Sequence, residues 1–411
     1  MTFRHLALLF VTIIATALTA GAQCAAGAVA DSCITPDHQV RISLITCGPG
    51  SDIYELEGHT GLRISTPQTD FVANWGMFDF NAPNFVGRFV MGKTDYQLGL
   101  IPTDMFLRSY GRQGRSVTEQ ELNLTPAQAM KVYDMVMENA RPENRVYRYN
   151  YIHDNCATRP LFIIEKAVSP DSLSLPSTAE MAEIPTFRMA MRRFHANYPW
   201  YQFGIDLALG SGIDYPISDR EQSFAPVTLC AMIDGATVHD GYGASRQLVC
   251  ERTEILPQSQ SGGPLAPTPW YLTPVAVFSL LAFIAALLSY RDIRRRKLSR
   301  WFDTIFYTLL GLTGCLSAFL VFISVHAATS PNMLLLWINP LCLIIPATIW
   351  LRRGLRVAAL YQYVNLAGIL TFAICWIAGP QSGNVAFIPL MLADAFRAVT
   401  YIYINRHPHV S

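Results

Sequence analysis

The sequence is poor in charged residues. Only 15% of its 411 residues are charged, against roughly 25% in an average soluble domain. The net charge is +1, so the charge balance does not favour nucleic acid or another polyanion as a partner. The sequence also lacks the Cys and His spacing of zinc sites and the glycine-rich loop of phosphate-binding motifs. We therefore expect no metal, no cofactor and no nucleic-acid partner.

Apolar residues are abundant instead, at 51% of the chain. The last third of the chain holds five apolar segments, each near the roughly 20 residues that a bilayer requires. They lie at about 271–290, 302–325, 332–350, 357–377 and 384–404. Basic residues follow the first, third and fifth segments, whereas the other two loops carry none. Because basic loops stay in the cytoplasm, this pattern places the C-terminus there and residues 23–270 outside.

The N-terminus has the features of a secretory signal. A weakly basic start precedes an apolar core at 6–20, and Ala20-Gly21-Ala22 fits the small-residue cleavage rule. Signal and loop charges agree on an inner-membrane protein whose N-terminal domain lies in the periplasm. The expected divisions are a signal peptide at 1–22, a periplasmic catalytic domain at 23–257, a linker at 258–270 and a five-helix transmembrane domain at 271–411.

Two pairings are expected from residue type and position. Asp394 and Arg397 lie three residues apart in the last apolar segment, so they can pair on one helix face and hold the bundle together. Disulfides are permitted outside the cytoplasm, and Cys230 with Cys250 is the favoured pair, although sequence alone does not fix the pairing.

The periplasmic part has the pattern of an α+β domain. Alternating residues predict strands, and Thr125-Pro126 with Gln128 has the form of a capped helix start. The expected strands lie at 40–47, 55–64, 71–80, 118–124 and 146–152, and the expected helices at 125–140, 157–168 and near 180–196.

Cys156 stands immediately before one of these helices. A cysteine at a helix start lies at the positive end of the helix dipole, which favours the thiolate and fast alkylation below neutral pH. His59, on a predicted strand, is the best candidate for its base. We therefore predict a Cys156–His59 acyl-transfer dyad. A structural cysteine and a surface histidine are the alternative interpretation.

Other polar residues can support this dyad. Asn74, or alternatively Asp79, would hold the imidazole in the correct tautomer. The Asn155 side chain, or backbone amides around Cys156, would stabilise an oxyanion. Arg63 lies on the same strand face as His59 and would bind a lipid phosphate, unless it is an ordinary solvated arginine.

The motif His59-x-Gly61-Leu62-Arg63-Ile64, with Asn155-Cys156 at a later helix start, resembles the permuted papain-like group of NlpC and lecithin–retinol acyltransferase-like enzymes. More closely, the chain resembles the Lnb family of lipoprotein N-acyltransferases of Bacteroidota. The resembling stretches are 47–50, 54–64, 74–80, 92–96 and 149–160, and the five-span tail also fits.

This resemblance implies that His59 and Cys156 are catalytic. It implies transfer of an acyl chain from a phospholipid, through a Cys156 thioester, to the α-amino group of the N-terminal diacylglyceryl-cysteine of lipoproteins. A phospholipid or cell-wall hydrolase with the same dyad is the first alternative, and an envelope binding protein without catalysis is the second.

Overall fold

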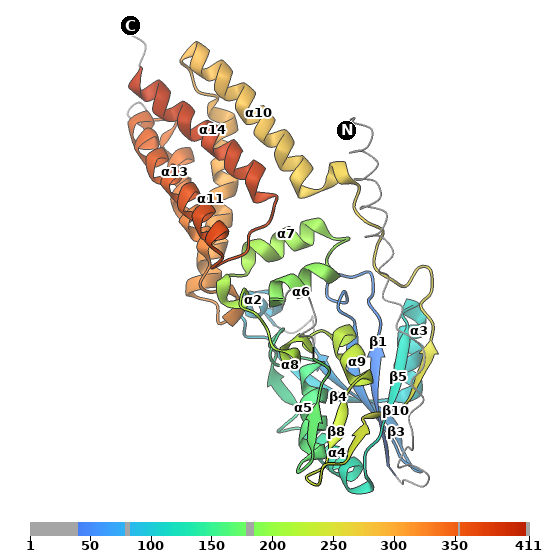
Figure 1. Ribbon diagram of the computed structural model, residues 1–411. Coiled ribbons are helices and arrows are strands. Elements are labelled where there is room, and N and C mark those ends of the chain that lie inside the picture. Colours follow the sequence, from blue (N-terminus) through green and yellow to red (C-terminus); the bar gives the residue numbers. More distant parts are fainter. Residues whose placement is uncertain (1–39, 79–82, 178–184, 352–353, 408–411) are drawn as a thin grey trace, which may run out of the picture.

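The computed structural model describes residues 40–78, 83–177, 185–351 and 354–407. The expected signal peptide and Asp79 lie outside these residues. The chain forms a sheet-based part and a helical bundle at opposite ends of an elongated molecule, and α6 (Phe187–Phe194) and α7 (Pro199–Ala208) lie between them (Figure 1).

Within the described residues, seven antiparallel strands form the main sheet, in the order β10-β5-β1-β2-β3-β4-β6. They are β1 (Arg41–Cys47), β2 (His59–Ser65), β3 (Asp70–Met77), β4 (Asp95–Pro102), β5 (Val117–Leu122), β6 (Val146–Arg148) and β10 (Val249–Leu256). A second sheet joins β7 (Ser172–Ser174), β8 (Thr237–His239) and β9 (Ser245–Gln247) in that order.

Helices cover both faces of the main sheet because its strands alternate buried side chains. Leu62 and its neighbours on one face pack against α4 (Pro126–Asn139), α5 (Thr158–Val168) and α9 (Pro226–Asp234). Val72, on the other face, packs with Phe106 of α3 (Thr103–Gln113). The α+β prediction and the capped helix start are confirmed, since Thr125 and Gln128 form a capping box. The remaining short helices are α2 (Phe85–Val90) and α8 (Asp219–Gln222).

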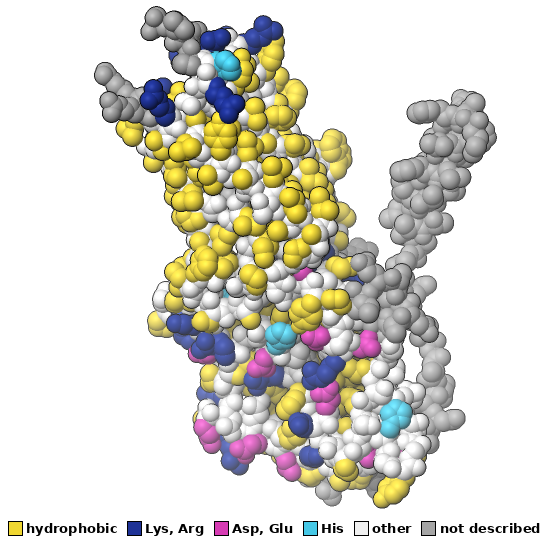
Figure 2. Space-filling model, turned by 60° about the vertical axis from the view of Figure 1, so that its left-hand side comes forward, with side chains coloured by type: hydrophobic (Ala, Val, Ile, Leu, Met, Phe, Trp, Pro, Cys, Tyr) yellow, Lys and Arg dark blue, Asp and Glu magenta, His cyan; other side chains and the backbone are white. Residues whose placement is uncertain are grey.

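Among the residues that the structure describes, the C-terminal part contains four helices long and apolar enough to cross a membrane. They are α10 (Pro274–Arg295), α11 (Arg300–Phe322), α13 (Gly354–Ala378) and α14 (Phe387–Arg406). Hydrophobic side chains cover this bundle, and Lys and Arg gather at its far end (Figure 2). This view agrees with the predicted membrane domain.

The third expected span, 332–350, is not one continuous helix. It is divided into η4 (Met333–Leu336), η5 (Pro340–Leu343) and α12 (Ile344–Thr348). Asn332 and Asn339 cap the first two pieces, and Pro340 and Pro346 contribute no amide donor. Trp337 and its apolar neighbours are buried among the other helices, which is where a membrane protein tolerates irregular backbone.

Both expected pairings are wrong. Arg397 bonds Asp303 at 2.6 Å and Asp292 at 2.9 Å, while Asp394 accepts from Tyr307, Trp337 and Asn365. The charges thus join different helices, which a pattern within one helix does not reveal. Cys250 is disulfide-bonded, whereas Cys230 is a buried thiol, so these two cysteines are not a pair.

Direct contacts join the two parts. Phe203 of α7 packs against Phe278 and Phe387 of the bundle, and Asn384 donates to Asp206 at 2.8 Å. The expected linker is also anchored, since the amide of Ser259 donates to Gly114 and the carbonyl of Leu265 accepts from Asn197. The sheet-based part is therefore held directly on the bundle.

Candidate active site

Cys156 lies in the turn before α5, two residues ahead of its first residue. Asn155 shapes this turn: its Oδ1 accepts from the amides of Ala157 and Thr158, and its Nδ2 donates to the carbonyls of Tyr151 and Phe224. Both ends of the buried Asn155 amide are thus committed to backbone. This arrangement favours a positioning role for Asn155 over the oxyanion role that we expected.

His59 is the first residue of β2, and Asn74 lies on the neighbouring strand β3. The two side chains meet, with 2.5 Å between His59 Nε2 and Asn74 Oδ1. Because an amide oxygen only accepts, Nε2 must carry the proton, which leaves the lone pair on Nδ1. The imidazole also stacks on Tyr110 of α3 with 6.3 Å between ring centroids. These contacts give His59 the tautomer of a base that acts through Nδ1.

Gly76 lies beside both Cys156 and His59. A Cβ placed on Gly76 would lie 3.7 Å from Cys156 Cβ and 4.0 Å from His59 Cε1. The backbone has φ +93° there, within the irregular stretch of β3 between Asn74 and Met77. The sequence placed Cys156, His59 and Asn74 together, and all three line one cavity.

Both members of the dyad are neutral at rest. Burial raises the pKa of the Cys156 thiol to about 11, although backbone amides of Thr60 and Cys156 hydrogen-bond the sulfur and oppose the rise. Burial lowers the pKa of His59 to about 4; the Asn74 bond opposes this shift and the Arg115 charge adds to it. The expected thiolate at neutral pH is therefore not supported, because desolvation outweighs the helix-end effect.

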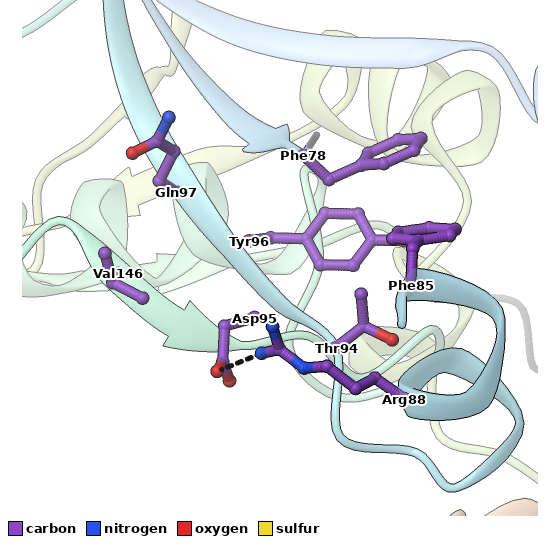
Figure 3. A pocket seen from close by; sticks show the side chains of 8 residues that line it. All are labelled: Phe78, Phe85, Arg88, Thr94, Asp95, Tyr96, Gln97 and Val146. Carbon is purple, nitrogen blue, oxygen red and sulfur yellow. Dashed lines mark hydrogen bonds and ion pairs between the residues drawn. The ribbon is translucent and has the colours of Figure 1, made fainter. Parts of the chain in front are cut away.

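The cavity has a volume of about 770 Å³, within the range of ligand sites. An aromatic row forms one wall, with each ring in contact with the next: Tyr149, Tyr96, Phe78, Phe85 and Phe89. Figure 3 shows the middle of this row, where Phe78, Tyr96 and Phe85 lie together beside the Arg88–Asp95 ion pair.

The aromatic row ends at the membrane domain. The Phe89 ring contacts His326, and the amide of Val325 donates to the carbonyl of Met91 just after α2. Tyr149 at the other end belongs to the loop that carries Cys156. A continuous apolar wall therefore runs from the thiol to the loop that follows α11.

Two family models match the chain. The Lnb N-terminal periplasmic domain matches residues 35–191, and the Lnb transmembrane domain matches residues 266–408. The chain belongs to the Lnb family. This family is associated with lipoprotein N-acylation, and the chain is a membrane protein with a periplasmic N-terminal domain. No curated protein and no solved structure matches the chain significantly, so a papain-like fold is not confirmed.

One expected site residue of this Lnb chain lies elsewhere. Arg63 bonds Asp70 at 2.7 Å and Glu119 at 2.9 Å, and it is not among the cavity residues. Its charge is thus neutralised on the sheet surface, so the predicted phosphate-binding role is not supported. The period-two pattern correctly placed Arg63 on the same face of β2 as His59. It could not predict that acidic residues of β3 and β5 neutralise its charge.

Three charged cavity residues of this Lnb chain were not predicted from the sequence: Glu55, Glu57 and Arg115. Glu57 accepts from the hydroxyl of Tyr151 and lies 2.9 Å from His195 Nε2. Arg115 is 4% exposed and bonds Glu55 at 2.8 Å. Glu57 lies in the stretch 54–64 that resembles the Lnb family, and this resemblance could have indicated a role for it. Arg115 follows a turn and lies in none of the resembling stretches. Among the described residues no cluster fits a metal ion.

Proposed function

We propose that the chain is a thiol-dependent lipoprotein N-acyltransferase of the inner membrane. It would move an acyl chain from a phospholipid, through a thioester on Cys156, to the α-amino group of the N-terminal diacylglyceryl-cysteine of lipoproteins. The observation that carries this proposal is the aromatic wall that joins the Cys156 loop to the membrane domain, because both substrates are lipids.

In the first half-reaction, the Cys156 thiol gives its proton to His59 Nδ1 as the sulfur attacks the donor ester carbonyl. The S–C bond forms and the C–O bond to glycerol breaks. The glycerol oxygen takes the proton from His59 and leaves as lyso-lipid. Because thiol and imidazole are both neutral at rest, proton transfer accompanies attack. The amides of Thr60 and Cys156 point at the sulfur and are the best placed donors for the oxyanion.

In the second half-reaction, the neutral amine of the lipoprotein attacks the thioester carbonyl. The N–C bond forms, the C–S bond breaks, and His59 carries the amine proton to the departing sulfur. Asn74 accepts from Nε2 of His59 throughout, so Nδ1 is the nitrogen that takes up and releases the transferred proton. Placement of donor, acceptor and dyad in one membrane-side cavity raises their effective concentration.

The test is mass spectrometry of a lipoprotein N-terminal peptide. We would compare cells that carry the wild-type chain, Cys156→Ser, His59→Ala or no protein. We expect an amide-linked acyl chain only with the wild type. Unchanged N-acylation across all four would contradict the proposal. Lyso-lipid release without N-acylation would instead indicate a hydrolase.

A further inference from the structure

Arg115 is a buried cation on the wall of the dyad cavity. Its side chain is 4% exposed, and it lies 4.9 Å above the ring of Tyr110, the residue on which His59 stacks. Its Nε donates to the carbonyl of Gly48 at 2.8 Å, and its Nη1 donates to Glu55 at 2.8 Å and reaches Gln113 at 3.5 Å. These bonds fix the plane of the guanidinium.

The remaining nitrogen of Arg115, Nη2, is buried and has no hydrogen-bond partner within the described part of the chain. Buried polar atoms are nearly always bonded, so an unfilled donor on a buried cation beside a cavity indicates a ligand acceptor. A planar guanidinium suits the paired oxygens of a phosphate or carboxylate.

The charges around Arg115 bear on whether its ligand is one of these anions or a neutral group. Glu55 already pairs with Nη1, and Glu57, on the same cavity, is engaged by Tyr151 and His195. Arg115 nevertheless lines the same cavity as Cys156 and His59, and its charge favours the ionised form of Cys156 and the neutral form of His59. A phosphodiester would therefore meet a cation beside the thiol.

We propose that Arg115 binds the phosphodiester of a glycerophospholipid donor while the ester carbonyl of that lipid lies at Cys156. The inference rests on the proposed acyl transfer. In a glycerophospholipid, only the short glycerol backbone separates the ester from the phosphate. A neutral diacylglycerol, or the diacylglyceryl group of the lipoprotein itself, has no phosphate and leaves Nη2 unfilled. Arg115 would thus select the donor class.

The experiment measures Cys156 thioester formation by intact mass spectrometry of the full-length chain in detergent micelles. The donors are phosphatidylglycerol and a neutral p-nitrophenyl ester of the same acyl chain. The variants are Arg115→Gln, Arg115→Lys and, as a matched control, Arg63→Gln. The informative quantity is the ratio of the two loading rates within one variant, since partial misfolding lowers both rates equally.

For Arg115→Gln we expect the ratio of phosphatidylglycerol loading to ester loading to fall about ten- to hundredfold, the range for loss of one charged hydrogen bond, whatever effect the lost charge has on the thiol and the imidazole themselves. The ratio for Arg115→Lys should lie between those of Arg115→Gln and the wild type. Arg63→Gln should keep the wild-type ratio. An unchanged ratio in Arg115→Gln would overturn the inference. A wild-type chain that forms no thioester from either donor would overturn the proposed function, and the inference with it.

Discussion

Cys156 is subject to two opposing effects. It precedes a helix start and receives two backbone hydrogen bonds, which favour the thiolate, yet it is 9% exposed and pays the larger desolvation cost. Desolvation wins, so the thiol is protonated until a substrate arrives. A buried neutral thiol is protected from adventitious alkylation and oxidation, which follow thiolate character and exposure.

Alkylation of Cys156 by iodoacetamide should therefore be slow below neutral pH. The thiolate is the reactive form, and burial raises the pKa of the Cys156 thiol to about 11. As long as the pH is below that pKa, the thiolate fraction rises about tenfold with each unit of increasing pH. We expect the rate to rise in this way between about pH 7 and pH 9. The measurement is mass spectrometry of the peptide that contains Cys156, with Cys156→Ser as the blank. A rate that is already level below pH 7 would indicate an ion-paired dyad instead.

At the residue scale, sequence patterns located the groups that chemistry requires but not their partners. Cys156, His59 and Asn74 occur in motifs of their own and line one cavity. Arg63 and Asn155 have equally suggestive positions, yet their polar atoms are occupied by other groups of the chain, some of them, such as Glu119 and Phe224, distant in sequence. Only the fold shows which polar atoms stay available.

At the scale of a single strand, β3 carries the irregularity that opens the site. Its register with β4 shifts between Asn74 and Met77, and Gly76 adopts φ +93° there. At this irregularity, a Cβ on Gly76 would contact both Cys156 and His59. Gly243 offers a matched position, because it has φ +96° and no atom of the described residues lies within 4 Å of the place that a Cβ would take.

Gly76→Ala should lose both stability and activity. A positive φ costs an L-residue about 1–2 kcal/mol, so Gly76→Ala and Gly243→Ala should lower the free energy of unfolding by similar amounts. Only at Gly76 does the new methyl group contact Cys156 and His59, where it would fill space beside the two side chains that a substrate needs, and a substrate displaced by about 1 Å reacts about a hundredfold more slowly. Thermal unfolding in detergent and thioester formation would be measured for both. Equal activity of the two variants would refute this role of Gly76.

Element prediction succeeded where a local signal was strong. Alternation identified the central strands, and the Thr125–Gln128 cap identified α4. The strand β4 and helix α3 were missed because neither has a continuous apolar pattern: most side chains of β4 are only partly buried, and most of those of α3 are exposed. The broken third span was taken as one helix because composition alone does not weigh Pro340 and Pro346.

At the scale of the whole molecule, Asp206 links the two parts. It is fully buried, and it accepts from Arg188 at 3.0 Å, from Arg192 at 3.1 Å and from Asn384 of the bundle at 2.8 Å. No pattern within one segment predicts such a contact, because its members come from distant parts of the chain.

Asp206→Ala should destabilise the protein strongly. Removal of one member of a buried charge cluster typically costs about 3–5 kcal/mol, because the remaining charge stays buried. Asp104→Ala is the control, since its pair with Arg108 is exposed and worth at most about 1 kcal/mol. Unfolding in detergent would be followed for both variants. Similar midpoints would show that Asp206 does not hold the parts together.

Under the proposed function, the aromatic row that ends at the loop after α11 also has a consequence for how substrates arrive. If both are drawn from the lipid phase, encounter occurs in two dimensions, and the quantity that sets the rate is mole fraction within the bilayer rather than amount per volume. Inert lipid would then act as a diluent. Turnover would follow the composition of the surrounding leaflet even when enzyme and substrate per cell stay constant.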